Sequence, residues 1–155
     1  MGGVELPEIY VDADACPVKK EVYRVAERYG LCVKIVANMS LWTPDAAWVE
    51  SVVVNGDPDA ADDWIAEHVA ANDIVVTDDI PLASRCIKKG ARVLTSKGRV
   101  FSEASIGEAL ASRDILSQLR EQGTISGGPA PLEAKDRSLF LQRFDQIVNA
   151  CLRQG

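Results

Sequence analysis

The chain has 155 residues, of which 47% are hydrophobic and 26% are charged, and its net charge is −6. These values are typical of one globular domain with a sizeable core, which we expect to cover residues 1–155. No apolar run approaches the roughly 20 residues that a membrane-spanning helix needs, so we expect no membrane partner. The first residues lack the basic and apolar regions of a signal peptide, and we expect a cytoplasmic protein.

The charge is unevenly distributed along the chain. Residues 1–79 carry 16 acidic and 5 basic side chains, whereas residues 80–155 carry 7 acidic and 12 basic ones. Within residues 80–100 there are six basic side chains and no acidic one. Solvated helix and loop faces are one interpretation. The alternative is an acidic centre beside a basic flank, which suits metal ions together with a phosphate backbone.

Apolar strands and amphipathic helices alternate along the chain. A strand at 8–12 precedes a helix at 18–29, which has Pro17 before it and Gly30 after it. The other predicted strands are 32–38, 51–55, 74–77, 91–95 and a short one at 99–101. The other predicted helices are 59–71, 81–89, 103–121 and 133–152, and residues 41–48 form a loop or short helical turn.

This order of elements predicts a single-domain α/β fold. We expect a three-layer sandwich in which helices cover both faces of a mostly parallel central sheet. The core should lie within about residues 8–101, and residues 102–152 should add C-terminal helices. The strand at 74–77 is apolar throughout, which favours a central position in the sheet.

Pairs of carboxylates follow two of the predicted strands. Asp12 and Asp14 come at the end of the first strand, and Asp78 and Asp79 follow the strand at 74–77. Asp12 and Asp14 point the same way if the chain stays extended. In open parallel sheets, sites form outside the carboxyl ends of the strands, so these acids should meet at one edge.

Helix geometry separates two further acids in the predicted helix at 59–71. At 100° per residue, Asp62 lies about 60° from Ile65 on the apolar face, whereas Asp63 lies about 160° away. We therefore expect Asp62 to lean toward the sheet edge and Asp63 to face solvent, although acids in a first turn also favour the helix dipole. His68 falls on the same apolar face and is expected to be a core histidine.

Two other positions leave alternatives open. Asp78 and Asp79 can each simply cap the helix that begins near Pro81; we prefer Asp79 as a ligand and Asp78 as a supporting residue. Asn38 ends the second strand and can bind substrate or a metal-bound water, or can serve only as a turn residue.

Several carboxylates at one edge repel one another unless they share protons or bind a cation. Oxygen ligands without a nearby cluster of Cys or His suit Mg²⁺ or Mn²⁺ rather than zinc.

Six segments occur in order over about residues 8–148: "VDADACPV", "VAN", "DAADDWIAEH", "IVVTDDIPLA", "KGARVL" and "SGGPAP". Together they resemble the YaiI/YqxD family of bacterial proteins, which is grouped with the PIN-like nucleases. The resemblance implies a PIN-like fold and metal-dependent hydrolysis of phosphodiester bonds, with RNA as the expected partner.

PIN-type nucleases have an Asp ending strand one, an acid on a later helix, and Thr/Ser-x-Asp after strand four. Asp12, Asp62, Thr77 and Asp79 match these positions. Asp14 is an addition, and because no clear further acid follows Asp79, it is the candidate for a fourth ligand.

The site implied by this resemblance has three parts. The expected catalytic residues and ligands of Mg²⁺ or Mn²⁺ are Asp12, Asp14, Asp62 and Asp79. The expected supporting residues are Thr77, Asp78 and Asn38, and the expected contacts to the nucleic-acid backbone are Lys97, Arg99, Gly127 and Gly128.

Two other functions fit the same residues. A phosphatase of the haloacid dehalogenase type would use Asp12 as nucleophile and Asp14 as general acid. This sequence, however, lacks the Thr that usually follows Asp-x-Asp in such enzymes, and it lacks a well-placed Lys before "TDD". A non-catalytic RNA- or partner-binding module is the third possibility. The sequence does not predict the oligomeric state.

Overall fold

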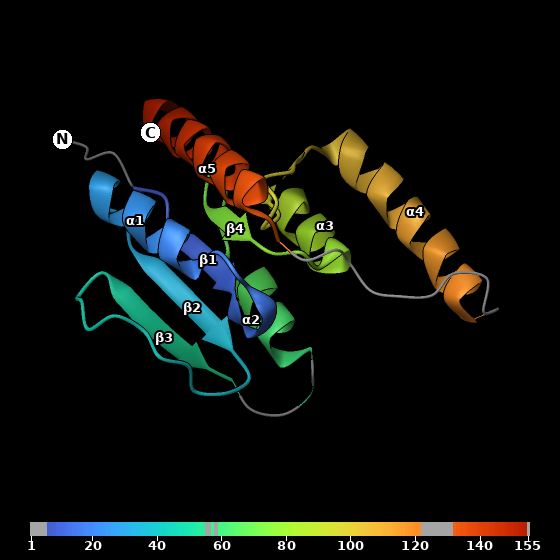
Figure 1. Cartoon of the computed structure of the whole chain (residues 1–155), viewed down its shortest axis with the longest axis horizontal. Helices are drawn as coiled ribbons and strands as arrows, with labels where there is room; N and C mark the ends of the chain where they lie inside the picture. The colour runs from blue at the N-terminus through green and yellow to red at the C-terminus, as the bar shows by residue number, and fades with distance from the viewer. Residues whose placement is uncertain (1–5, 55–56, 58, 122–131, 155) are drawn as a thin grey trace.

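A computed structural model gives the structure of residues 6–54, 57, 59–121 and 132–154. One six-stranded sheet forms its centre, and helices lie on both sides of the sheet (Figure 1). The predicted three-layer α/β sandwich is therefore confirmed.

The sheet brings the carboxyl ends of five strands to one edge. Its strands are β1 (Ile9–Asp12), β2 (Val33–Ala37), β3 (Val49–Val53), β4 (Ile74–Val76), β5 (Arg92–Leu94) and β6 (Val100–Phe101). They are arranged in the order β3-β2-β1-β4-β5-β6; the first five are parallel, and β6 pairs antiparallel with β5. The register Val11↔Val76 then places Asp12 and Thr77 next to each other at the ends of the two central strands.

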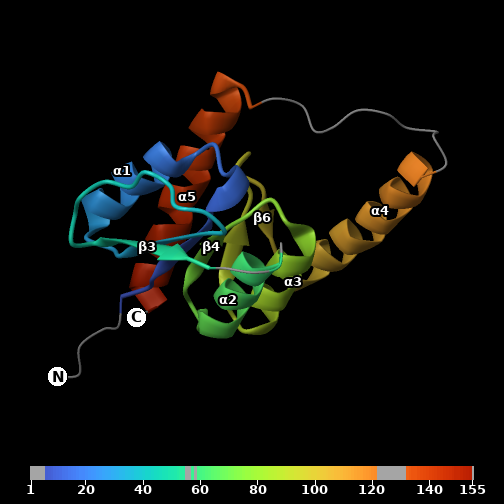
Figure 2. The ribbon, with the colours of Figure 1, turned by 90° about the horizontal axis from the view of Figure 1, so that it is seen from below.

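The helices divide between the two faces of the sheet. They are a 3₁₀ turn, η1 (Ala13–Ala15), and the α-helices α1 (Lys19–Tyr29), α2 (Ala60–His68), α3 (Ile80–Lys88), α4 (Glu103–Glu121) and α5 (Ala134–Gln154). α1 and α5 cover one face, whereas α2, α3 and the start of α4 cover the other (Figure 2). In the described part of the chain, no helix is both long enough and apolar enough to cross a bilayer.

The alternation of β1 feeds both layers of the core. Ile9 and Val11 face the α1 and α5 side, and Tyr10 faces the α2 and α3 side. Phe140 and Phe144 of α5 are completely buried on the first side, with ring centroids 5.4 Å apart. The last helix therefore completes the core between α1 and the sheet.

Gly98 lets α5 approach the turn between β5 and β6. Its φ is 86°, and a Cβ atom there would lie 3.0 Å from backbone atoms of Leu139 and Phe140. Any larger residue would be strained by the backbone angle and would press against the helix.

Most predicted elements agree with the structure to within one residue at each end, but β3 is displaced. The predicted strand at 51–55 is wrong by two residues, because β3 covers Val49–Val53, and position 55 lies outside the described residues. Glu50 pairs across the strands with Lys34, and its Oε2 lies 2.8 Å from the Lys34 Nζ. This ion pair allows a charged residue at the start of an edge strand, where the apolar pattern gave no sign of pairing.

The end of α2 and the environment of His68 also differ from expectation. The helix stops before 71 because the Asp73 carboxylate accepts a hydrogen bond from the Ala70 N–H (2.9 Å), which turns the chain toward β4. His68 is exposed, so the prediction of a core histidine is wrong. Its ring stacks on Trp64 one turn earlier, with centroids 3.8 Å apart, and this contact holds it at the rim of the apolar face.

We expect Phe144→Ala to lower the free energy of unfolding by about 3–5 kcal/mol, because it leaves a cavity between α5, α1 and the sheet. Leu139→Ala on the same helix should cost less than about 1 kcal/mol, since Leu139 is 38% exposed. Urea unfolding followed by circular dichroism measures both. Equal losses would contradict the placement of α5 in the core.

Candidate active site

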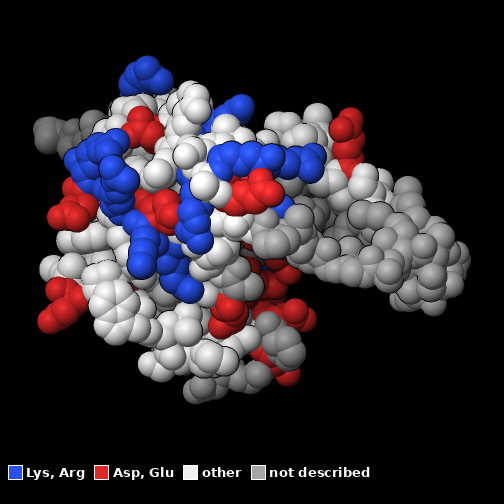
Figure 3. All heavy atoms as spheres, viewed as in Figure 1, with Lys and Arg blue, Asp and Glu red and all other residues white. Residues whose placement is uncertain are grey.

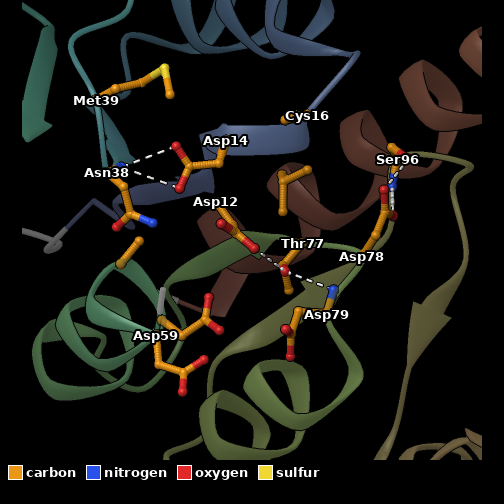
Figure 4. Close-up of a pocket in the computed structure, with 13 residues that line it drawn as sticks. Asp12, Asp14, Cys16, Asn38, Met39, Asp59, Thr77, Asp78, Asp79 and Ser96 are labelled. Carbon is orange, nitrogen blue, oxygen red and sulfur yellow. Dashed lines mark hydrogen bonds between the residues drawn. The ribbon is translucent and has the colours of Figure 1, made fainter. Parts of the chain in front are cut away.

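A cleft of about 520 Å³ opens at the carboxyl ends of β1, β2 and β4. Figure 4 shows carboxylates reaching it from the sheet edge and from α2. The described residues that line it are Asp12, Asp14, Cys16, Asn38, Met39, Asp59, Ala61, Asp62, Val76, Thr77, Asp78, Asp79 and Ser96. None of these described lining residues is Lys, Arg or His, so the cleft concentrates negative charge.

Thr77 holds Asp12 at the centre of the cleft. The buried Thr77 hydroxyl donates to Asp12 Oδ2 (2.8 Å) and accepts from the Asp79 backbone N–H (3.0 Å). Burial is the main cause of a raised pKa at Asp12; the Thr77 hydrogen bond opposes it, and the charge of Asp79 adds to it. Asp14 and Asp78 raise the pKa further. Asp12 is therefore fixed in direction but poorly compensated in charge.

Asp14 reaches the cleft by a different route from the one expected. The chain does not stay extended after Asp12, because residues 13–15 form η1, so the condition under which both acids would point the same way is not met. The Asn38 backbone N–H instead donates to both carboxylate oxygens of Asp14, at 3.0 and 3.2 Å (Figure 4). Asp14 thus ties the end of β1 to the end of β2 while lining the same cleft.

The two acids of α2 separate as helix geometry predicts. Asp62 lines the cleft, whereas Asp63 is exposed and binds Arg85 with an N–O distance of 2.8 Å. Burial, followed by the charges of Asp12 and Asp79, raises the pKa of Asp62 to about 7. The hydrogen bonds found between described residues include none to the Asp62 carboxylate, so little offsets its desolvation.

Asp78 and Asp79 both line the cleft, but they bind different elements. Asp79 caps α3 by accepting from the Leu82 N–H (2.8 Å), as a capping residue would. Asp78 accepts from the Ser96 N–H (2.8 Å) and from the Ser96 hydroxyl (2.6 Å), which ties the end of β4 to the loop after β5. Asp79 therefore combines the capping role with a position in the cleft.

The predicted backbone contacts lie beside the cleft or outside the described structure. Lys97 and Arg99 do not line it, but they belong to the loop whose Ser96 does. The Arg99 guanidinium lies over the Phe101 ring, 4.8 Å from its centroid. Gly127 and Gly128 lie outside the described residues.

Sequence reasoning missed several features of the surface. Ser96 and Met39 line the cleft, and each is the second residue after the end of a strand. Those positions in the sequence could have identified them as lining residues. Charge counting also missed the basic face of α1, where Lys20, Arg24 and Arg28 are exposed. Figure 3 shows Lys and Arg gathered over that helix, and acidic side chains near α2.

A metal ion fits the donors of the cleft in chemistry but would need water as well. The available donors are carboxylate and hydroxyl oxygens, which Mg²⁺ and Mn²⁺ prefer. Over the described residues, no three His, Cys, Asp or Glu side chains are grouped closely enough to hold an ion. An ion in this cleft would therefore have to keep several of its waters, as magnesium usually does.

We expect Asp62→Asn to stabilise the metal-free protein in a pH-dependent way. At pH 4 the substitution should change little, because Asp62 is protonated in the folded protein and only about half ionised in the unfolded chain, whose Asp pKa is about 3.9. As the pH rises toward the folded-state pKa of about 7, the unfolded chain ionises freely, whereas the folded protein resists ionisation. The advantage of Asp62→Asn should therefore grow and level off above pH 7, at about 1–2 kcal/mol after solvent screening.

Urea unfolding in chelator at pH 4, 6 and 8 tests this expectation. Asp63→Asn is the matched control on the same helix; it removes an exposed carboxylate and should show no such growth with pH. An advantage of Asp62→Asn that is equal at all three pH values would contradict the charge repulsion inferred for the cleft.

Comparison with known proteins gives a consistent family assignment. The sequence model described as "Uncharacterized BCR, YaiI/YqxD family" matches residues 10–150. A UPF0178 protein of Rhodospirillum rubrum is 50% identical over 94% of this chain and 98% of its own length. Those of Rhodospirillum centenum and Brucella canis are 55% and 53% identical over 94% and 95% of this chain, and over 97% and 92% of their own lengths.

No solved structure matches the chain. The bacterial relatives agree with the resemblance found in the sequence motifs, and they span nearly the whole chain. The protein therefore belongs to the YaiI/YqxD family, also called UPF0178.

Proposed function

We propose that the protein is a metal-dependent nuclease that hydrolyses phosphodiester bonds, with RNA as its expected substrate. The observation that carries this proposal is the convergence of Asp12, Asp62 and Asp79 on one cleft whose described lining has no basic side chain. A phosphate could approach these carboxylates only if a cation neutralised them. The resemblance to PIN-like nucleases adds support, because these three acids match its pattern.

The residues of the cleft suit distinct roles in hydrolysis. Asp12, oriented by Thr77, and Asp79 would hold Mg²⁺ or Mn²⁺, which supplies positive charge to the phosphoryl group and lowers the pKa of a bound water. Asp62, which lines the same cleft and whose pKa burial raises in the metal-free protein, would accept the proton of the attacking water. As the water oxygen bonds to phosphorus, the bond to the leaving oxygen breaks. The leaving oxygen would take a proton from solvent, and the products would be a phosphate monoester and an alcohol.

The phosphatase alternative has less support. As general acid, Asp14 would have to present a protonated oxygen to the leaving group, but both of its oxygens accept hydrogen bonds from the Asn38 N–H. The described lining also lacks a Lys to bind the phosphate. The roles of Asp14 and Asn38 are therefore better described as fixing the geometry of the sheet edge.

We expect Mn²⁺ or Mg²⁺ to raise the melting temperature of the wild-type protein and to support cleavage of an RNA oligomer. At ten times the dissociation constant, the ion should stabilise the fold by about 1.4 kcal/mol. Asp12→Asn and Asp79→Asn should abolish both responses. Asp63→Asn should keep both responses, because Asp63 faces solvent and Arg85.

Thermal scans and a substrate panel of RNA, single-stranded DNA and p-nitrophenyl phosphate make these measurements. A wild-type protein that shows no metal response and no hydrolysis would sink the nuclease proposal. Metal binding without hydrolysis would favour a binding module, and hydrolysis of the monoester alone would favour the phosphatase.

We also expect the loop after β5 to guide the nucleic acid by charge. Lys97→Ala with Arg99→Ala should weaken RNA binding and flatten its dependence on salt, because fewer counterions are released. Lys88→Ala with Lys89→Ala is the matched control, since both residues lie at the C-terminal end of α3, away from the cleft. There the Lys89 ammonium donates to the backbone carbonyl of Glu67 in α2. Binding across a salt series in Ca²⁺ measures both pairs, and equal effects would remove the nucleic acid from this loop.

A further inference from the structure

An exposed apolar surface borders the cleft on the side opposite the basic loop. Met39, Trp42 and Val53 are 63%, 81% and 46% exposed, and we call these three residues the apolar rim. Met39 also lines the cleft. Val53 pairs in register with Ala37, the last residue of β2, so it lies at the same edge of the sheet. Single exposed apolar residues need no explanation, but three that are carried by the ends of β2 and β3 and by the segment after β2 do.

The segment that carries Trp42 is anchored on both sides. The Asn38 N–H binds Asp14, and Leu41 packs against the core beneath α1. Trp42 follows directly, and its Cα lies within about 14 Å of the Asn38 Cα, because four residues can span no more. Residues 38–44, "NMSLWTP", carry no charge. The indole is thus presented to solvent from an anchored, uncharged loop.

The strand order arranges three kinds of surface in a row. Across the sheet edge from β3 to β5 come the apolar rim, the acids around Asp12 and Thr77, and the loop with Lys97 and Arg99. Neighbouring strands are about 4.8 Å apart, so this row covers roughly 19 Å. A polymer that carries flat apolar groups and phosphates in alternation fits such a row.

We propose that this row binds single-stranded nucleic acid lying across the strands, with one base stacked on Trp42. The scissile phosphate then lies over Asp12, and the following backbone runs toward Lys97 and Arg99. This inference rests on the proposed nuclease function. Stacking is uncharged, so it supplies affinity that repulsion by the acids does not oppose, and it requires a base that is free of a duplex.

Binding measured in Ca²⁺, without turnover, tests the inference. The probes are a uridine octamer, an abasic phosphodiester of equal length, and a duplex. Trp42→Ala should weaken binding of the octamer by about 5- to 100-fold, the range expected for one stacked base. Trp42→Phe should restore most of the affinity. Affinity for the abasic probe should not change, because that probe has no base to stack.

Trp64→Phe is the control for altering a tryptophan elsewhere, since Trp64 stacks on His68 away from the cleft, and it should bind the octamer like wild type. Unchanged octamer affinity in Trp42→Ala would overturn the inference. An equal loss of affinity for all three probes would also overturn it. Loss of a dimer without loss of RNA binding would overturn it too, because the apolar rim would then be a contact between two copies of the chain. If Trp42→Ala failed to fold, quenching of wild-type tryptophan fluorescence by the octamer, absent in Trp42→Phe, would decide.

The outcome is separable from that of the nuclease proposal. Binding of the octamer that depends on Trp42, without hydrolysis in Mn²⁺, would retain the binding row and discard the nuclease. Hydrolysis that ignores the Trp42 substitutions would retain the nuclease and discard the row.

Discussion

The Thr77 hydroxyl determines how negative charge is arranged in this protein. It lies between the ends of the two central strands, donates to the Asp12 carboxylate, and accepts from the backbone N–H of Asp79. A hydroxyl can do both at once, which a carboxylate or an ammonium cannot. Without this donor, Asp12 would face other acids with no polar partner from its neighbouring strand, and the parallel pairing of β1 with β4 would bring together charges that repel.

Backbone N–H groups hold three of the other acids in place. Asp14, Asp78 and Asp79 accept from amides of β2's end, the loop after β5, and the first turn of α3. Each such bond fixes the direction of its carboxylate. Asp62 approaches the group from α2 with no such bond among the described residues, and its burial, followed by the charges of Asp12 and Asp79, raises its pKa. The site therefore combines carboxylates that backbone amides hold in place with Asp62, which reaches the cleft from a helix.

The sequence predicts the part of this arrangement that depends on periodicity. Strand ends at one edge follow from alternating strands and helices, and the separation of Asp62 from Asp63 follows from 100° per residue. Local turns and specific side-chain contacts determined the features that the sequence did not predict. A 3₁₀ turn redirected Asp14, an ion pair extended β3 to include Glu50, and stacking on Trp64 drew His68 to the surface. Neither the hydrophobic pattern nor the count of charges predicts such contacts, because they depend on how particular groups fit together in the folded protein.

The close packing at Gly98 links α5 indirectly to the cleft. The turn that carries Gly98 rests directly on the backbone of α5 at Leu139, and the same turn begins with Ser96, which holds Asp78. Two short, stiff contacts therefore connect a helix more than forty positions later in the chain to an acid at the sheet edge. A substitution that displaced α5 would therefore also shift the Asp78 carboxylate, through the Gly98 turn and Ser96, so the site constrains which changes the helix can accept.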